Sequence, residues 1–99
     1  MLLCEVAMGK IKELRSSFET MESLPAGFDS VKALGKKEPD PYNNVNMPNG
    51  CLIPLGEKQT CKLKPGEYIH MRNIENNQYI VYNESQVCIR YIVQYSILD

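Results

Sequence analysis

The feature that most constrains the fold is an alternating run of side chains near the end of the chain. From residue 87 to 97 every second residue is apolar or aromatic, and the residues between them are polar or small except for Ile92. A period of two places alternate side chains on opposite faces of a β-strand. Residues 79–82 form a second aromatic and β-branched run, and the polar residues 83–86 separate the two. We therefore expect two consecutive strands joined by a turn or short connection, with the second strand half-buried.

The middle of the chain is rich in signals for turns and short strands. The dipeptide Asn49-Gly50 predicts a tight turn that closes a hairpin between residues 44–47 and 51–53. Pro65-Gly66 marks another turn, followed by an expected short strand at residues 67–71. With 99 residues, the chain has room for one domain at most.

The segment from Lys10 to Glu22 supports two interpretations. Apolar residues recur there at helical spacing, and Ser16 with Glu19 could form a capping box, so propensity favours a short helix. The second interpretation, which we expect, is a short strand or loop followed by one helical turn.

Four blocks of sequence, in the same order, resemble the C-terminal part of the poly(ADP-ribose) polymerase (PARP) catalytic domain, a family of ADP-ribosyltransferases. The blocks are residues 2–9 (LLCEVAMG), residues 24–41 (LPAGFDSVKALGKKEPDP), residues 53–56 (IPLG), and residues 79–82 (YIVY) with the later Gln86 and Arg90-Tyr91. They cover most of the chain except about residues 57–75.

The resemblance implies a fold, a domain assignment and a reaction. The fold class is α+β, mainly antiparallel β, as the C-terminal segment of an ADP-ribosyltransferase fold. Residues 1–99 correspond to the C-terminal portion of the catalytic domain, without the N-terminal half whose His and Tyr bind NAD⁺. The only histidine, His70, lies in the unmatched stretch and is expected to be a surface or turn residue. The implied reaction transfers ADP-ribose from NAD⁺ to protein acceptors and releases nicotinamide.

One departure from the family pattern limits that reaction. The family has a catalytic Glu directly before the Tyr-x-x-Tyr strand, and this chain has Gln78 there. Glu75 and Glu84 cannot replace it without breaking the match. A carboxylate stabilises the positive charge that develops on the ribose and accepts a proton from the acceptor, whereas an amide does neither. The sequence thus predicts mono-transfer at best. The alternatives are a catalytically inactive PARP-like binding or scaffold module, and an independent β-domain of common ancestry.

Composition narrows the partners and the compartment. The 11 basic and 12 acidic residues nearly cancel, so no overall charge would attract nucleic acid or membrane. The four cysteines lack zinc-ligand spacing, and Cys4 and Cys88 lie in strand patterns where we expect them to be reduced and buried. No apolar run is long enough to span a membrane. These features favour a nuclear or cytoplasmic location, and the family resemblance implies protein acceptors as partners. Without the N-terminal half, we expect strands with apolar side chains left uncovered.

Overall fold

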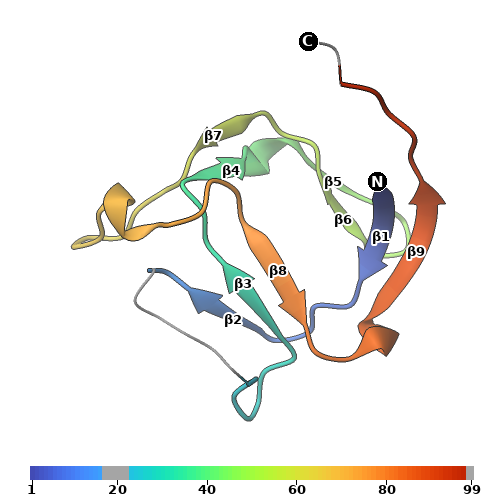
Figure 1. Cartoon of the computed structure of the whole chain (residues 1–99), viewed down its shortest axis with the longest axis horizontal. Coiled ribbons are helices and arrows are strands. Elements are labelled where there is room, and N and C mark those ends of the chain that lie inside the picture. Colours follow the sequence, from blue (N-terminus) through green and yellow to red (C-terminus); the bar gives the residue numbers. More distant parts are fainter. Residues whose placement is uncertain (17–22, 98–99) are drawn as a thin grey trace.

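The computed structural model describes residues 1–16 and 23–97, and this part of the chain forms short strands in four small sheets (Figure 1). The first sheet pairs β1 (Leu2–Val6) with β9 (Val87–Ile92), and the second joins β2 (Ile11–Leu14), β3 (Ser30–Ala33) and β8 (Gln78–Val81). The other two sheets pair β4 (Lys37–Pro39) with β7 (Lys58–Thr60) and β5 (Asn44–Asn46) with β6 (Leu52–Pro54). The described helices are the 3-10 turns η1 (Pro41–Asn43), η2 (Ile69–Met71) and η3 (Glu84–Gln86).

The prediction of a mainly antiparallel β-structure with little helix is confirmed. Every strand pair is antiparallel except β2–β3, which is parallel. The two strands expected after residue 78 both form, and η3 joins them as the expected short connection. They are consecutive in the chain but lie in different sheets, because β8 pairs with β3 while β9 pairs with β1.

The expectation that the last strand is half-buried was wrong. All residues of β9 are exposed, and Tyr91 and Ile92 expose 66% and 82% of their surface. Cys4 and Cys88, expected to be buried, are exposed on the β1–β9 pair. The physical reason is that a period of two buries one face of a strand only where another layer covers that face, and the residues of β9 remain exposed. This exposure agrees with the expectation of apolar side chains left uncovered.

The three-stranded sheet holds the buried centre of the described chain. Its middle strand β3 carries Ser30 and Val31, both fully buried, because β2 and β8 flank it on both sides. The Ser30 hydroxyl donates to the Met8 carbonyl at 2.7 Å, which satisfies a polar group with no access to water. Val31 is the one buried hydrophobic side chain among the described residues, so this sheet is the part of the fold with a core.

The segment after Lys10 begins as a strand. Residues Ile11–Leu14 form β2 and pair in parallel with β3, so the expected short strand or loop is a strand and the helix favoured by propensity does not form there. The strand wins because pairing with β3 supplies interstrand hydrogen bonds that outweigh a weak local preference. The helical turn expected further on falls at residues 17–22, outside the described residues.

The Asn49-Gly50 hairpin is confirmed, whereas the strand expected at residues 67–71 is wrong. Met47 and Cys51 close the hairpin turn with a 2.8 Å hydrogen bond, and Gly50 has a φ of +89° that favours glycine. Residues Ile69–Met71 instead form η2, where the Met71 N–H donates to the Tyr68 carbonyl at 3.0 Å. The backbone N–H groups of Met71 and Arg72 are satisfied locally, by the carbonyls of Tyr68 and Ile69.

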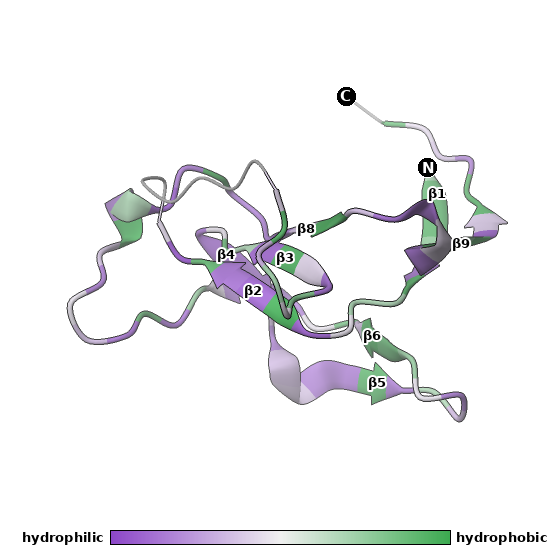
Figure 2. Cartoon of the chain, turned by 90° about the horizontal axis from the view of Figure 1, so that it is seen from below, coloured by the Kyte–Doolittle hydropathy of each residue, from purple (hydrophilic) through white to green (hydrophobic). Residues whose placement is uncertain are grey.

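Apolar surface remains spread over the molecule. Figure 2 shows β1 and β6 as largely hydrophobic elements, whereas β2 and β5 are mostly hydrophilic. The radius of gyration is 15.0 Å, compared with about 13 Å for a compact domain of 100 residues. The described chain is therefore looser than a typical domain, and its packing is concentrated around β3.

Candidate active site

Gln78 is the first residue of β8 and lies opposite Ala33 of β3. Its side chain is exposed and makes no hydrogen bond to a described residue. Strand β8 presents it at the edge of the only sheet with a buried centre in the described chain. The residue that the family resemblance singled out thus stands at the end of a well-anchored strand.

The segment leading into Gln78 is held against the loop between β3 and β4. The Asn77 Oδ1 accepts a hydrogen bond from the Gly35 N–H at 2.8 Å, and the Lys37 N–H donates to the Glu75 carbonyl at 2.8 Å. Gly35 allows this approach because a Cβ there would lie 2.5 Å from the Asn76 carbonyl carbon. Since those contacts involve backbone atoms, they hold the backbone of the segment that leads into Gln78 in one position.

A cavity of about 210 Å³ adjoins Gln78. Its polar lining consists of Ser16, Arg72, Asn73 and Gln78. Its apolar lining consists of Leu14, Ala33, Leu34 and Ile74. The described lining contains no carboxylate, so the chemical groups available are a guanidinium, amides and a hydroxyl. Pockets for whole drug-sized ligands run from about 300 to 1,000 Å³, and this cavity therefore has room for only one part of such a ligand.

A pair of arginines shares one glutamate beside this cavity. Arg72 exposes 2% of its surface, and its Nη2 donates to Glu67 Oε2 at 3.1 Å. Arg15 meets the same carboxylate from β2's end through Nε and Nη2, with the Nη2–Oε1 contact also at 3.1 Å. The Lys64 N–H adds a backbone hydrogen bond of 2.7 Å. These donors hold the pKa of Glu67 down, from its ordinary 4.5 to about 2, with the Arg15 hydrogen bond as the largest cause.

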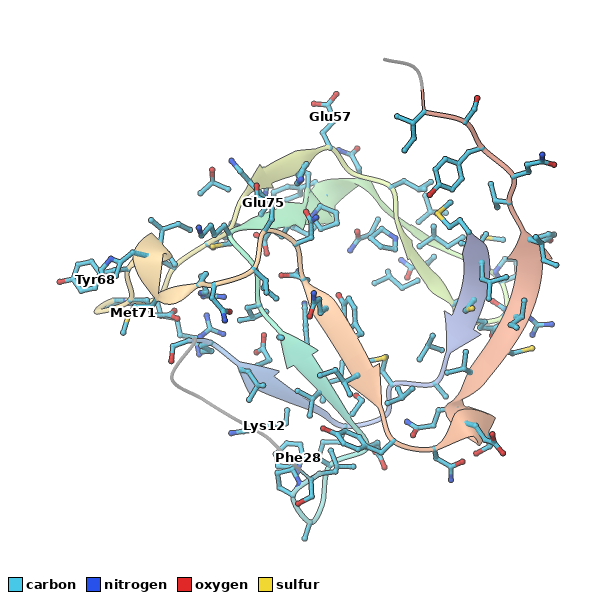
Figure 3. The ribbon with its side chains drawn as sticks, viewed as in Figure 1. Lys12, Phe28, Glu57, Tyr68, Met71 and Glu75 are labelled. Atoms are coloured by element: carbon cyan, nitrogen blue, oxygen red, sulfur yellow. The ribbon has the colours of Figure 1, made fainter. Side chains whose placement is uncertain are left out.

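The other candidate acids and bases lie away from the cavity. His70 is exposed in η2, as expected for a surface residue, and stacks on Tyr68 with ring centroids 5.6 Å apart. Figure 3 shows Glu75 on the segment that leads into β8, away from Tyr68 and Met71 of the η2 region. Glu75 and Glu84 are both exposed, and neither lines the cavity beside Gln78.

A second polar cluster lies on the β1–β9 sheet. The Arg90 Nη2 is 2.7 Å from Glu5 Oε2, and the Cys51 thiol donates to the same carboxylate. That hydrogen bond raises the pKa of Cys51, because it stabilises the protonated thiol. The cluster joins the hairpin to the β1–β9 sheet and shares no residue with the Gln78 cavity.

Within residues 1–16 and 23–97, no three His, Cys, Asp or Glu side chains gather closely enough to hold a metal ion. The same part of the chain contains no helix with the length and apolar character needed to cross a membrane.

Sequence reasoning missed Arg72. It lies in the stretch of about residues 57–75 that matches no family block, and an isolated Arg before a strand is ordinarily solvent-exposed. Only the tertiary structure buries it between η2 and β8, against Glu67. The nearby Pro65-Gly66 turn, which positions Glu67, was the sole local signal.

Known proteins are similar to this chain along nearly its whole length. The family profile described as the poly(ADP-ribose) polymerase catalytic domain matches residues 1–97. Poly [ADP-ribose] polymerase 2 of Arabidopsis thaliana is 36% identical over 95% of this chain and 14% of its own length. Poly [ADP-ribose] polymerase 2 of Homo sapiens is 40% identical over 100% of this chain, and poly [ADP-ribose] polymerase 1 of Caenorhabditis elegans is 36% identical over 95%. The chain spans only 17% and 10% of the length of those two relatives. It belongs to the poly(ADP-ribose) polymerase catalytic domain family.

Proposed function

We propose that this chain is the C-terminal segment of an NAD⁺-dependent protein ADP-ribosyltransferase domain, with the ADP-ribosyltransferase fold completed by an N-terminal half. The complete domain would transfer single ADP-ribose units from NAD⁺ to protein acceptors, slowly, and release nicotinamide. Gln78 would stand at the position of the family's catalytic Glu. The proposal includes a nuclear or cytoplasmic location.

The observation that carries the proposal is the place of Gln78. It begins β8, directly before the Tyr79–Tyr82 run that matches the family, and it borders a cavity without a carboxylate in its described lining. The family to which the chain belongs uses NAD⁺ as its substrate. Family membership supports the reaction type, and the neutral side chain supports the low rate.

The cost of replacing a carboxylate by an amide can be bounded. A unit charge about 4 Å from the developing ribose cation, at an effective dielectric of about 20, contributes roughly 4 kcal/mol. That energy corresponds to roughly a thousandfold in rate. Loss of general-base catalysis would account for roughly 10²- to 10⁴-fold in a step that needs it. The two effects overlap because a single carboxylate supplies both.

A second candidate function is a catalytically inactive binding or scaffold module. The observation that favours it is the combination of Gln78 with the buried cation Arg72 in one cavity. A cation beside the ribose would oppose the positive charge of the transition state rather than stabilise it. In this case the cavity would bind a ligand without turning it over.

The test is nicotinamide release from NAD⁺ by a chimera. The N-terminal half of the catalytic domain of the Arabidopsis thaliana relative is joined to this chain, and Gln78 is compared with Gln78→Glu. The proposal expects slow release by the Gln78 form and an increase of roughly 10²- to 10³-fold for Gln78→Glu. The matched control is Gln94→Glu, which makes the same charge change at an exposed residue outside the cavity.

The outcomes separate the two candidates. Slow turnover that rises with Gln78→Glu supports a transferase limited by its amide. NAD⁺ binding without nicotinamide release in either form, from a folded chimera, supports the binding module. Equal turnover by the Gln78 and Gln78→Glu forms would overturn the assignment of Gln78 to the catalytic position.

A further inference from the structure

The tip of the β5–β6 hairpin carries an asparagine followed directly by a glycine. Asn49 and Gly50 are both exposed, and a Cβ added to Gly50 would meet nothing within 4 Å. The side-chain carbonyl carbon of Asn49, Cγ, and the backbone nitrogen of Gly50 belong to neighbouring residues. A bond between them would therefore close a small ring, and intramolecular reactions of this kind are strongly favoured over the same reaction between separate molecules.

The turn already holds a hydrogen-bond donor on the Asn49 side-chain oxygen. The Cys51 N–H donates to Asn49 Oδ1 at 3.0 Å. When a nucleophile adds to Cγ, the electron pair of the carbonyl bond moves onto this oxygen. A backbone N–H aimed at the oxygen stabilises that developing charge, as backbone donors do for the tetrahedral intermediates of acyl transfer. The folded hairpin thus activates the Asn49 amide toward attack.

The nucleophile for this attack is the Gly50 backbone nitrogen. Its N–H donates to the Met47 carbonyl at 2.9 Å, so this hydrogen bond has to open before the nitrogen can react. Single hydrogen bonds in exposed loops open locally at a small free-energy cost compared with global unfolding. Glycine also lacks the Cβ that would crowd the closing ring. The hairpin tip therefore allows the nitrogen to approach Cγ without unfolding of the chain.

We propose that Asn49 is a site of spontaneous deamidation and isomerisation through a succinimide. The Gly50 nitrogen loses its proton to solvent and forms a bond to Asn49 Cγ, and the bond from Cγ to the side-chain nitrogen breaks. That nitrogen takes up a proton and leaves as ammonia. Water then adds to either carbonyl carbon of the ring and opens it, giving aspartate or isoaspartate. Water is the only co-reactant, so the reaction is independent of NAD⁺ and of the proposed function.

The products would alter the contact between the hairpin and the β1–β9 sheet. The Cys51 thiol donates to Glu5, and the Asn49 side chain is also hydrogen-bonded to this thiol. Aspartate at position 49 would replace an amide donor by a second carboxylate beside Glu5. Because a nearby negative charge disfavours the thiolate, the pKa of Cys51 would rise further. Isoaspartate would also lengthen the backbone of the turn between Met47 and Cys51.

The test is peptide mass spectrometry of the folded 99-residue chain during incubation at neutral and mildly alkaline pH. The proposal expects the mass change of an NH₂-to-OH exchange at Asn49, and methylation of the product by an isoaspartate-specific methyltransferase. The rate should rise with pH, because the Gly50 nitrogen must lose a proton. The internal controls are Asn43 and Asn46, which are exposed but not followed by glycine. They should react at least about tenfold more slowly, which corresponds to about 1.4 kcal/mol in the barrier.

Two glycines in similar turns provide the matched variants. Gly50→Ala should slow the reaction of Asn49 by about tenfold or more, again about 1.4 kcal/mol in the barrier, because it crowds the closing ring. Gly27→Ala makes the same change at a φ of +88°, also in open space, but in a different turn. It should leave the Asn49 rate within about twofold of the parent chain, since sites without shared contacts act independently.

Three outcomes would overturn the proposal. The first is an Asn49 rate in the folded chain no higher than that of Asn46. The second is reaction of Asn49 in urea but not in the folded chain, since the turn would then protect the amide instead of activating it. The third is an equal effect of Gly50→Ala and Gly27→Ala, which would trace the change in rate to general destabilisation.

Discussion

The Arg72 guanidinium is almost fully buried against Glu67, with Nη2 3.1 Å from Oε2, and it borders the same cavity as Gln78. This ion pair links the η2 turn to the segment leading into β8. Because Arg15 joins the same carboxylate from the end of β2, two parts of the chain that are 52 residues apart in sequence meet at Glu67. Loss of this ion pair should therefore affect both the stability of the fold and the shape of the candidate site.

Glu67 should make stability depend on acid pH. Its pKa is about 2 in the folded chain and ordinarily 4.5, so its contribution is complete above about pH 4.5 and is lost as pH falls toward 2. Glu67→Gln should lower the unfolding midpoint in urea at pH 7 and flatten the dependence between pH 4.5 and 2. The control is Glu57→Gln, an exposed glutamate that lines neither cavity and lies apart from Tyr68 and Met71 in Figure 3. An unchanged slope in Glu67→Gln would show that the ion pair does not stabilise the fold.

Gly35 should be required for the close packing of the segment that precedes Gln78. An added Cβ would lie 2.5 Å from the Asn76 carbonyl carbon and 2.7 Å from the Glu75 oxygen, so the Gly35→Ala chain should lose about 1–3 kcal/mol. Backbone amide signals of residues 75–78 should shift with it. At Gly27 a Cβ would meet nothing within 4 Å, so Gly27→Ala tests conformational cost alone, at a φ of +88°. Matching signals for residues 75–78 in Gly35→Ala and the parent chain would contradict the close approach.

Val31→Ala should be the most destabilising apolar truncation on β3. The side chain is fully buried, so the change removes about two methylene equivalents and leaves a cavity, at a cost of about 2 kcal/mol. Ile89→Ala on β9 removes more apolar surface, but Ile89 is 58% exposed and the loss should stay below about 1 kcal/mol. Urea unfolding of both variants measures the difference. A larger loss for Ile89→Ala would place the core on the β1–β9 sheet.

Cys51 should react slowly with thiol reagents at neutral pH. Its hydrogen bond to Glu5 raises the thiol pKa, and the thiolate is the reactive form. Glu5→Gln should therefore speed maleimide labelling of Cys51, measured by mass spectrometry of its peptide. Cys4 lies on the same strand as Glu5, is exposed, and provides the internal control for altered folding. If both cysteines speed up equally, loosening of the sheet rather than the hydrogen bond is the cause.

The sequence by itself determined the local elements whose signals are short-range. The strand at β8 and the Asn49-Gly50 hairpin follow from neighbouring residues or from a match to the family. The same is true of Gln78, which was identified because it directly precedes the Tyr79–Tyr82 run. Such features depend on few long-range contacts, so a linear pattern suffices to predict them.

Only the tertiary structure decided which residues are buried and which groups meet. Alternation predicted a half-buried β9, but burial needs a covering layer, and no described element covers Ile89 or Tyr91. Arg72 shows the converse, because a charged residue without a sequence signal became almost completely buried through its contact with Glu67. Burial depends on which distant segments pack together. A sequence pattern predicts the alternation of a strand, but it does not predict which element covers the strand's face and excludes water from it.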